Sequence, residues 1–251
     1  MVKSSKSWQA RLIRHLREWH RKLGIVAAFF LIFLSITGIA LNHTDSFKLA
    51  HFNVKSTWLL DHYGIKAPNQ LSFFSDNIIA TDQLIWLENT LLLEVATPVV
   101  SIGKFQNYIL IATEQSFYIY TQRGELVDQL DTSSGLPYGI SEMFLSKSNV
   151  IVKAATGYYQ TDSNFYDWQK ITTAVEPSWI VKTDATPEKK SSAILNYKSQ
   201  FLTWERIIVD THSGRFFGII GVYFMDAVAL LLILLSLSGI YIWIRYARAK
   251  R

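Results

Sequence analysis

The sequence predicts an α + β membrane protein in which two transmembrane helices flank a β-rich extracytoplasmic domain. Three observations lead to this fold class. An uncharged apolar stretch lies near each end of the 251-residue chain. Basic residues cluster between each stretch and the nearer terminus. The region between the stretches alternates short apolar runs with turn signals, a pattern typical of strands.

The distribution of charge explains the formal net charge of +5. Residues 1–22 carry +6 and residues 245–251 carry +4, whereas residues 43–215 carry −4 and Asp226 contributes −1. A nucleic-acid-binding domain would carry its positive charge on the folded region, so this distribution excludes one and indicates two membrane-surface anchors. The chain has no cysteine, which excludes disulfides and thiolate metal sites.

The first 22 residues predict a basic amphipathic helix in the cytoplasm. Its apolar residues recur at helical spacing and alternate with arginines: Trp8, Leu12, Leu16 and Trp19. This helix either lies along the inner leaflet or continues the first span directly. Residues 23–42 form that span, because about 20 apolar residues cross a bilayer. A cleaved signal peptide is disfavoured because the apolar stretch is followed by polar residues and not by a small-residue cleavage site.

The second span covers residues 216–244, and a basic cytoplasmic tail, residues 245–251, follows it. Lys and Arg collect on the cytoplasmic side of short flanking segments. We therefore expect both termini in the cytoplasm and the central domain in the periplasm of a bacterial inner membrane. The lipid bilayer is the first predicted partner.

Between the spans we expect a juxtamembrane segment (43–69), a β-rich periplasmic domain (70–182) and a helical linker (183–215). Residues 108–130 resemble residues 149–171, at an offset of 41 residues that matches a four-stranded propeller blade. The domain is too short for a full propeller, so we expect a blade-like antiparallel meander or a sandwich. It contains no recognisable catalytic motif.

Three of the six histidines stand at span ends: His20 at the inner end of the first, His43 at its outer end and His212 before the second. His20 and His43 are separated by about 35 Å of helix and so lie at opposite faces. Imidazoles from different helices can hold a haem iron, and no cysteine is needed. The alternative is that these are ordinary interfacial residues.

Small residues recur in both spans, as Leu34–Ile39 (LSITGI) and Leu235–Ile240 (LSLSGI). They favour close helix packing, or alternatively leave space for a flat macrocycle. Asp226 is an ionisable residue inside the second span, where its partner would be Arg215 or a polar group of another subunit. It predicts a proton relay or a haem-propionate neighbour; otherwise it is an interfacial acid that reaches the headgroups.

Two blocks resemble the PepSY-associated transmembrane proteins. The first is Trp19-His20-Arg21-Lys22-Leu23-Gly24 with Ser35-Ile36-Thr37-Gly38 and Asn42-His43. The second and more specific block begins Asp210-Thr211-His212-Ser213-Gly214-Arg215 and continues through Asp226 to Ser238-Gly239-Ile240. This chain departs from the larger members in having two spans instead of four and no evident PepSY module.

The resemblance implies a bacterial inner-membrane protein linked to iron uptake. It implies b-type haem and electron transfer to ferric siderophores, with His20, His43 and His212 as ligands and Arg215 and Asp226 as cofactor neighbours. Bis-histidine haem would occupy His43 and His212 outside, with His20 at an inner haem. A homodimer or larger membrane complex would restore four spans. The alternative function is a non-enzymatic anchor whose β domain binds or regulates a periplasmic partner protein; a transporter subunit is the weaker third.

Overall fold

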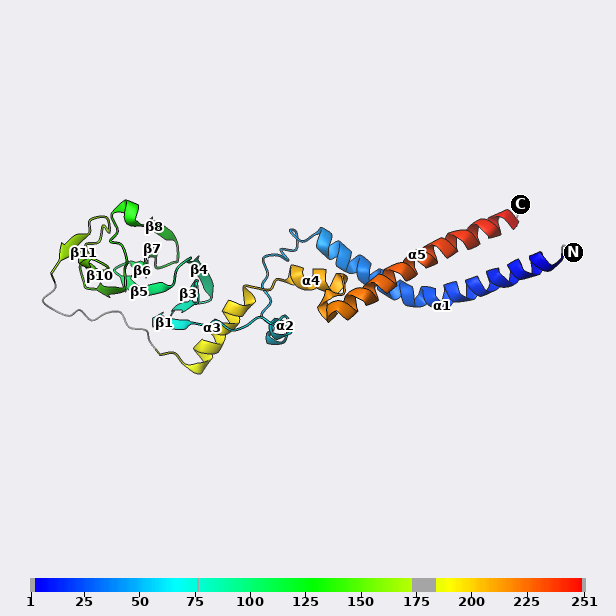
Figure 1. Cartoon of the computed structure of the whole chain (residues 1–251), viewed down its shortest axis with the longest axis horizontal. Helices are drawn as coiled ribbons and strands as arrows, with labels where there is room; N and C mark the ends of the chain where they lie inside the picture. The colour runs from blue at the N-terminus through cyan, green and yellow to red at the C-terminus, as the bar shows by residue number, and fades with distance from the viewer. Residues whose placement is uncertain (1–2, 76, 173–183, 250–251) are drawn as a thin grey trace. The chain divides into compact units, whose positions relative to one another are not determined.

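The chain folds into two compact units (Figure 1, coloured from blue at the N-terminus to red at the C-terminus). The computed structural model describes residues 3–75, 77–172 and 184–249. The helical unit comprises residues 1–54 and 202–251, and the β unit comprises residues 55–201. This α + β membrane architecture confirms the predicted fold class.

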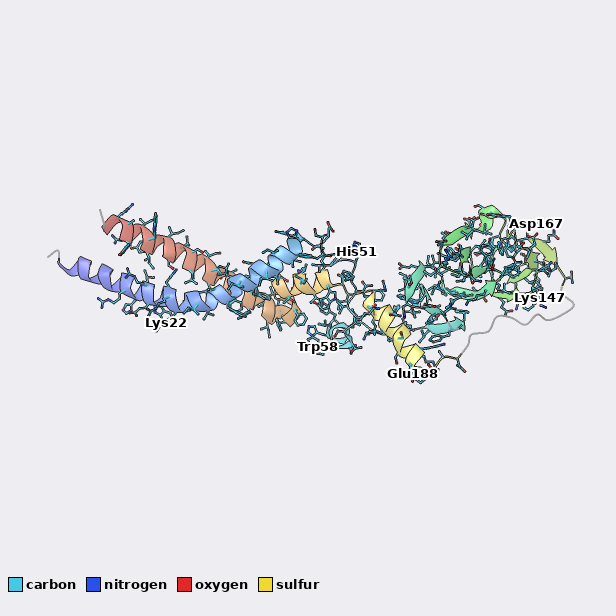
Figure 2. All side chains as sticks on the ribbon, turned by 180° about the vertical axis from the view of Figure 1, so that it is seen from behind. Lys22, His51, Trp58, Lys147, Asp167 and Glu188 are labelled. Carbon is cyan, nitrogen blue, oxygen red and sulfur yellow. The ribbon has the colours of Figure 1, made fainter. Side chains whose placement is uncertain are left out.

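Two long helices dominate the helical unit, and both are long and apolar enough to cross a membrane. Helix α1 (Lys3–Asn42) is uninterrupted, so its basic segment continues directly into its apolar part, with Lys22 at the junction (Figure 2). Helix α5 (Gly218–Ala249) packs against it, with the rings of Phe30 and Phe224 5.4 Å apart. The N-terminal end of α1 and the C-terminal end of α5 lie at the same end of this unit (Figure 1).

A short helix, α4 (Trp204–His212), leads into α5 through the 3-10 turn η2 (Arg215–Phe217). Thr203 caps α4 by accepting a hydrogen bond from the backbone N–H of Arg206 at 3.3 Å. Gly214 has φ +81°, and a Cβ there would lie 2.3 Å from the carbonyl oxygen of Gly221. The turn into the second span therefore requires glycine.

The expected helical linker, 183–215, is not one helix. Helix α3 (Pro187–Ser199) belongs to the β unit, whereas α4 belongs to the helical unit. The second span starts at Gly218 and extends as helix to Ala249, past the expected end at residue 244. Residues 173–183, at the junction of the expected β domain and linker, lie outside the described residues.

The β unit contains three four-stranded antiparallel sheets, each a meander of consecutive strands. Blade 1 consists of β1 (Leu71–Ser75), β2 (Ile78–Thr81), β3 (Leu84–Leu87) and β4 (Thr90–Glu94). Blade 2 consists of β5 (Val99–Phe105), β6 (Tyr108–Thr113), β7 (Phe117–Thr121) and β8 (Leu126–Leu130). Blade 3 consists of β9 (Glu142–Leu145), β10 (Val150–Ala154), β11 (Gly157–Thr161) and β12 (Gln169–Ile171). The expected meander is confirmed, and the repeated segments occupy β6–β8 and β10–β12.

The core of the β unit follows the period-2 alternation of strands. Ile109 and Ile111 of β6 pack toward blade 1, whereas Leu110 and Ala112 pack toward blade 3. The middle blade is therefore buried on both faces, which explains the continuous apolar run in its sequence.

The outer face of blade 1 is covered by α3, where Ala193 joins the cluster around the buried Trp86. Tyr197 of α3 donates a hydrogen bond to Asp82 Oδ2 at 2.9 Å. The short helix α2 (Thr57–His62), capped by Ser56, is tied to α3 by the Lys198–Asp61 ion pair.

Candidate functional site

The same contact geometry occurs at both ends of the α1–α5 pair. At the end near the termini, His20 of α1 places Nδ1 2.9 Å from Ser238 Oγ of α5. At the other end, His212 of α4 places Nδ1 2.7 Å from Thr37 Oγ1 of α1. Two of the three predicted histidines are thus held between helices, and each is partly buried.

The two hydroxyl groups determine which nitrogen of each imidazole carries the proton. Thr37 Oγ1 donates its proton to the carbonyl oxygen of Phe33 at 2.9 Å, and Ser238 Oγ donates to that of Leu235 at 3.0 Å. A hydroxyl has one proton, so toward the histidine it can only accept. With the hydroxyl protons on these carbonyl groups, each imidazole is assigned as an Nδ1–H donor, and its Nε2 atom is left for another partner.

The internal repeat of the two spans explains why the contacts match. Thr37-Gly38 and Ser238-Gly239 occupy equivalent positions in LSITGI and LSLSGI. In both copies the ring of a histidine lies over the glycine: a Cβ on Gly38 would lie 3.8 Å from His212 Cε1, and one on Gly239 3.2 Å from His20 Cε1. The small residues serve both helix packing and the placement of an imidazole.

An apolar cavity of about 250 Å³ lies next to the His212 contact. Its lining includes Thr211 and Gly214, which flank His212, and Phe33, whose carbonyl group binds Thr37. The remaining lining residues are apolar or glycine: Phe29, Phe30, Phe217, Gly221, Phe224 and Met225. A flat apolar group could enter here without displacing a polar side chain.

The structure does not bring His43 to His212. His43 is exposed and its ring lies 6.0 Å from that of Phe47. It follows Thr37 by six residues, about 240° around an α-helix, and so leaves α1 on a different face from the one that meets His212.

The family of the chain follows from the comparison of its sequence with known families. Residues 2–246 match the family described as "PepSY-associated TM region". The chain belongs to this family. The match includes both histidine contacts and both spans, and it makes the chain a membrane-associated protein of the PepSY type.

Comparisons with other proteins add little to the PepSY-associated family assignment. No curated protein matches the sequence. Similar solved structures include the N-terminal domain of Nup159 (10% identity, TM-score 0.30, 44% of this chain and 35% of that chain). A second example is KlHsv2 with loop 6CD replaced by a Gly-Ser linker (13% identity, TM-score 0.29, 42% of this chain and 39% of that chain). A third is HIRA(644-1017) (11% identity, TM-score 0.26, 37% of this chain and 36% of that chain). The chain spans little more than a third of each.

An ion-pair cluster in the family's His-Ser-Gly-Arg region was missed by the sequence analysis. The Asp210 side chain, 3% exposed, accepts from Arg206 Nε at 2.8 Å and from Arg215 Nε at 2.9 Å. Arg215 thus pairs with Asp210 instead of Asp226, the partner expected from the sequence. The i,i+4 spacing of Arg206 and Asp210 on an amphipathic helix was the available signal.

Asp226 itself is exposed on α5. Within residues 3–75, 77–172 and 184–249 it forms no hydrogen bond or ion pair. Within those residues, Asp226 therefore takes part in neither histidine contact.

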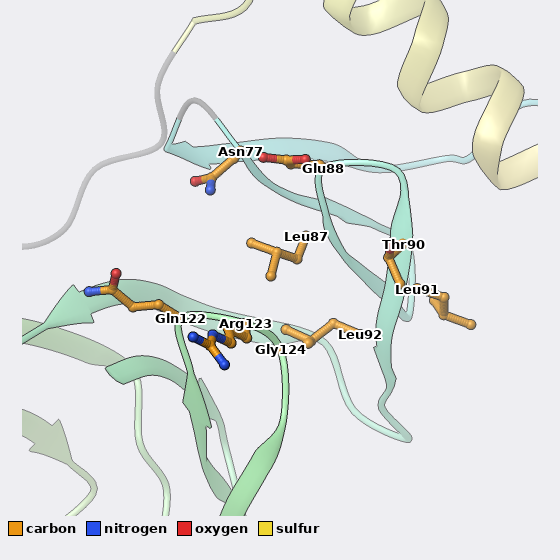
Figure 3. A pocket seen from close by; sticks show the side chains of 9 residues that line it. All are labelled: Asn77, Leu87, Glu88, Thr90, Leu91, Leu92, Gln122, Arg123 and Gly124. Carbon is orange, nitrogen blue, oxygen red and sulfur yellow. The ribbon is translucent and has the colours of Figure 1, made fainter. Parts of the chain in front are cut away.

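The β unit of this PepSY-associated protein has a polar cavity of about 300 Å³ between blades 1 and 2 (Figure 3). Asn77 and Glu88 lie along one wall, with Gln122 and Arg123 along the other. Leucines form its apolar part: Leu87, Leu91 and Leu92. Glu88 and Arg123 form no ion pair within the described part of the chain. Nothing in the sequence marked this cavity, because its residues come from separate turns.

Proposed function

We propose that this protein binds b-type haem at two depths of the bacterial inner membrane and transfers electrons between them. The observation that carries the proposal is the pair of imidazoles held as Nδ1–H donors. A histidine that ligates a metal through Nε2 commonly donates its other N–H to a fixed acceptor. Thr37 and Ser238 supply such acceptors for His212 and His20.

The proposed topology follows from the basic ends of the two helices. Lys and Arg at both ends favour the cytoplasmic side. His20 then lies near the cytoplasm and His212 near the periplasm. His20 and Thr37 are 17 residues apart on α1, so the two levels are separated by about 25 Å along the helix.

The residues at each level fit the proposed group. The donor set consists of neutral imidazole nitrogen atoms, the usual axial ligands of haem where cysteine is absent. At the periplasmic level the cavity beside His212 offers an apolar wall of phenylalanines. The glycines at positions 38 and 239 keep a side chain from blocking the approach to each ring.

The protein's own contribution would be orientation and exclusion of water. Thr37 and Ser238 fix the ring orientation of His212 and His20, and their acceptance of the Nδ1 proton makes Nε2 the ligating atom. The apolar walls lower the local dielectric constant, which tunes the reduction potential. When bound, haem supplies one-electron transfer. Ferric siderophores are the proposed acceptors.

Visible spectroscopy of the purified full-length protein tests this function. Expressed with ample haem, the wild type should give a b-type α band in the reduced-minus-oxidised spectrum. The band should weaken in His212→Ala and remain in His51→Ala, a control at a histidine outside both contacts. A colourless wild type, or an unchanged band in a His20→Ala/His212→Ala variant, would contradict the proposal.

A second candidate function is binding of a periplasmic partner protein by the anchored β unit. The cavity between blades 1 and 2 favours it, because Glu88 and Arg123 offer opposite charges on facing walls (Figure 3). A photo-cross-linking amino acid at Gln122 in the full-length chain should capture one defined protein. That capture should be lost in Glu88→Ala/Arg123→Ala; equal capture by the double variant would exclude the cavity.

A further inference from the structure

The exposed face of α5 carries a heptad pattern along the whole span. Eight residues recur at alternating spacings of four and three and lie on the face turned away from α1: Ile219, Tyr223, Asp226, Leu230, Ile233, Leu237, Ile240 and Ile244. All eight are exposed. Apolar residues at this 3.5-residue period, sustained over several heptads, are typical of a helix that packs along a second helix.

Asp226 is the one carboxylic acid in this pattern. An aspartate that faces lipid within a span is costly, because the hydrocarbon neither hydrates nor pairs its charge. Asp226 nevertheless has no hydrogen-bonding or ion-pair partner within the described residues of its own chain. A partner outside the chain would remove this cost.

The exposed face of α1 provides a comparison. It too has residues at heptad spacing, but they are all apolar: Ile25, Phe29, Ile32, Ile36 and Ile39. Such an apolar face can lie against lipid without any polar partner. Of the two exposed faces, only that of α5 carries a side chain that needs a polar partner, Asp226.

A donor for Asp226 lies on the same face, one helical turn away. Tyr223 is 67% exposed, and its hydroxyl group forms no hydrogen bond within the described residues. In a parallel pair related by a two-fold axis each seam position meets its own copy, and Tyr223, one turn before Asp226, also borders the aspartate of the other helix. The interface is then self-complementary, as a symmetric dimer requires.

We infer that a second copy of this chain docks on this face, forming a parallel α5–α5 dimer. Two copies inserted in the same orientation present their α5 helices in parallel. A single polar residue in an otherwise apolar seam sets the register and the number of helices in coiled coils. Asp226 and Tyr223 serve that purpose here. The inference stands on the helix face alone and does not depend on haem.

Disulfide trapping tests the dimer directly, because the chain has no cysteine of its own. Single-cysteine variants of the full-length protein are oxidised in membranes. Leu230→Cys and Leu237→Cys, in the α5 seam, should form disulfide-linked dimers. Ile32→Cys and Ile36→Cys, on the exposed face of α1, are the matched controls and should stay monomeric. Equal trapping on both helices, trapping on α1 alone, or none at any position would overturn the inference.

The polar pair is tested in the Leu230→Cys background. Asp226→Leu and Tyr223→Phe should each slow disulfide formation, by about fivefold, because each removes two symmetric interhelical hydrogen bonds. Asp226→Asn keeps an acceptor and should trap at nearly the original rate. The sedimentation mass of the unmodified protein in detergent should correspond to two chains of 28.8 kDa. A monomeric mass at every concentration, or faster trapping in Asp226→Leu, would contradict the account.

Discussion

His20 and Ser238 are 218 residues apart in sequence, and their Nδ1 and Oγ atoms are 2.9 Å apart in the helical unit. His212 and Thr37 repeat the contact at the opposite end of the same helix pair. In both cases the hydroxyl proton goes to a backbone carbonyl group of its own helix, which assigns the shared proton to the imidazole. The predictions below start from this relationship.

Removal of the Thr37 hydroxyl group should weaken ligation by His212. Thr37→Val keeps the shape of the side chain but leaves Nδ1 without its acceptor, so the ring loses its fixed orientation. We expect haem affinity to fall by about 10–100-fold, the usual effect of such an outer partner. Absorbance titration of the apoprotein with haem measures it. Thr37→Ser retains the hydroxyl group and should bind as the wild type does; identical affinities in all three would refute the role of Thr37.

The two glycines should respond differently to a methyl group. A Cβ at Gly239 would lie 3.2 Å from His20 Cε1, closer than ordinary contact, whereas one at Gly38 would lie 3.8 Å from His212 Cε1. Gly239→Ala should therefore displace His20 and reduce the haem bound, while Gly38→Ala should have little effect. The haem content per purified chain measures the two effects. A larger loss of haem in Gly38→Ala than in Gly239→Ala would be inconsistent with the geometry.

Arg206 and Arg215 both pair with Asp210, so either arginine should largely compensate for loss of the other. Each donates through Nε to one carboxylate oxygen, and each is more than half exposed. Arg206→Gln or Arg215→Gln alone should cost roughly 1 kcal/mol or less, because the other arginine still pairs the carboxylate. The double variant removes both of these ion pairs from a buried carboxylate, so its cost should exceed the sum of the two single costs. Thermal unfolding in detergent measures the difference; strictly additive effects would contradict the shared partner.

Helix α3 should detach more readily without the Tyr197 hydroxyl group. Tyr197 donates to Asp82 Oδ2 at 2.9 Å, and burial together with this bond raises the pKa of Tyr197. Tyr197→Phe should cost about 1 kcal/mol and speed tryptic cleavage at Lys189 and Lys190 about fivefold. Tyr166→Phe, which removes a bond to Asp128 in blade 2, is the control. Equal cleavage rates in the wild type and Tyr197→Phe would show that the hydrogen bond from Tyr197 to Asp82 does not hold α3 in place.

The same bond gives a pH dependence with a definite sign. The pKa of Tyr197 is higher in the folded protein than in the unfolded chain. Its contribution to stability is therefore complete below the unfolded value and is lost as the pH rises through the folded value. The free energy of unfolding of the wild type should therefore approach that of Tyr197→Phe as the pH rises through the folded pKa of Tyr197, measured by urea denaturation at each pH.

Much of the fold follows from local patterns in the sequence. The two spans follow from their uncharged length, and the blades follow from alternating apolar runs and the 41-residue offset, which corresponds to β6–β8 and β10–β12. The linker was harder to predict. The break between α3 and α4 depends on Leu202 and Thr203 pairing with Val54 and Asn53, a long-range contact that local composition does not encode.

The candidate site was predictable in its residue types but not in its pairings. The sequence singles out His20, His43 and His212 because they stand at span ends, and it identifies the LSxxGI repeat. It does not indicate that Thr37 and Ser238 meet these histidines, since that depends on how α1 packs against α4 and α5. His43 and Arg215 were assigned partners by depth alone, whereas helix rotation and the buried Asp210 direct them elsewhere.

The ratio of haem to protein in the two histidine variants tests the central claim most directly. The account predicts that purified His20→Ala and His212→Ala each retain part of the wild-type haem, and that the double variant retains none. Because His20 and Thr37 are about 25 Å apart along α1, we expect each single variant to leave the other proposed site intact. A wild type without haem, or a single variant that loses all of it or none, would contradict the claim of two separate haem sites.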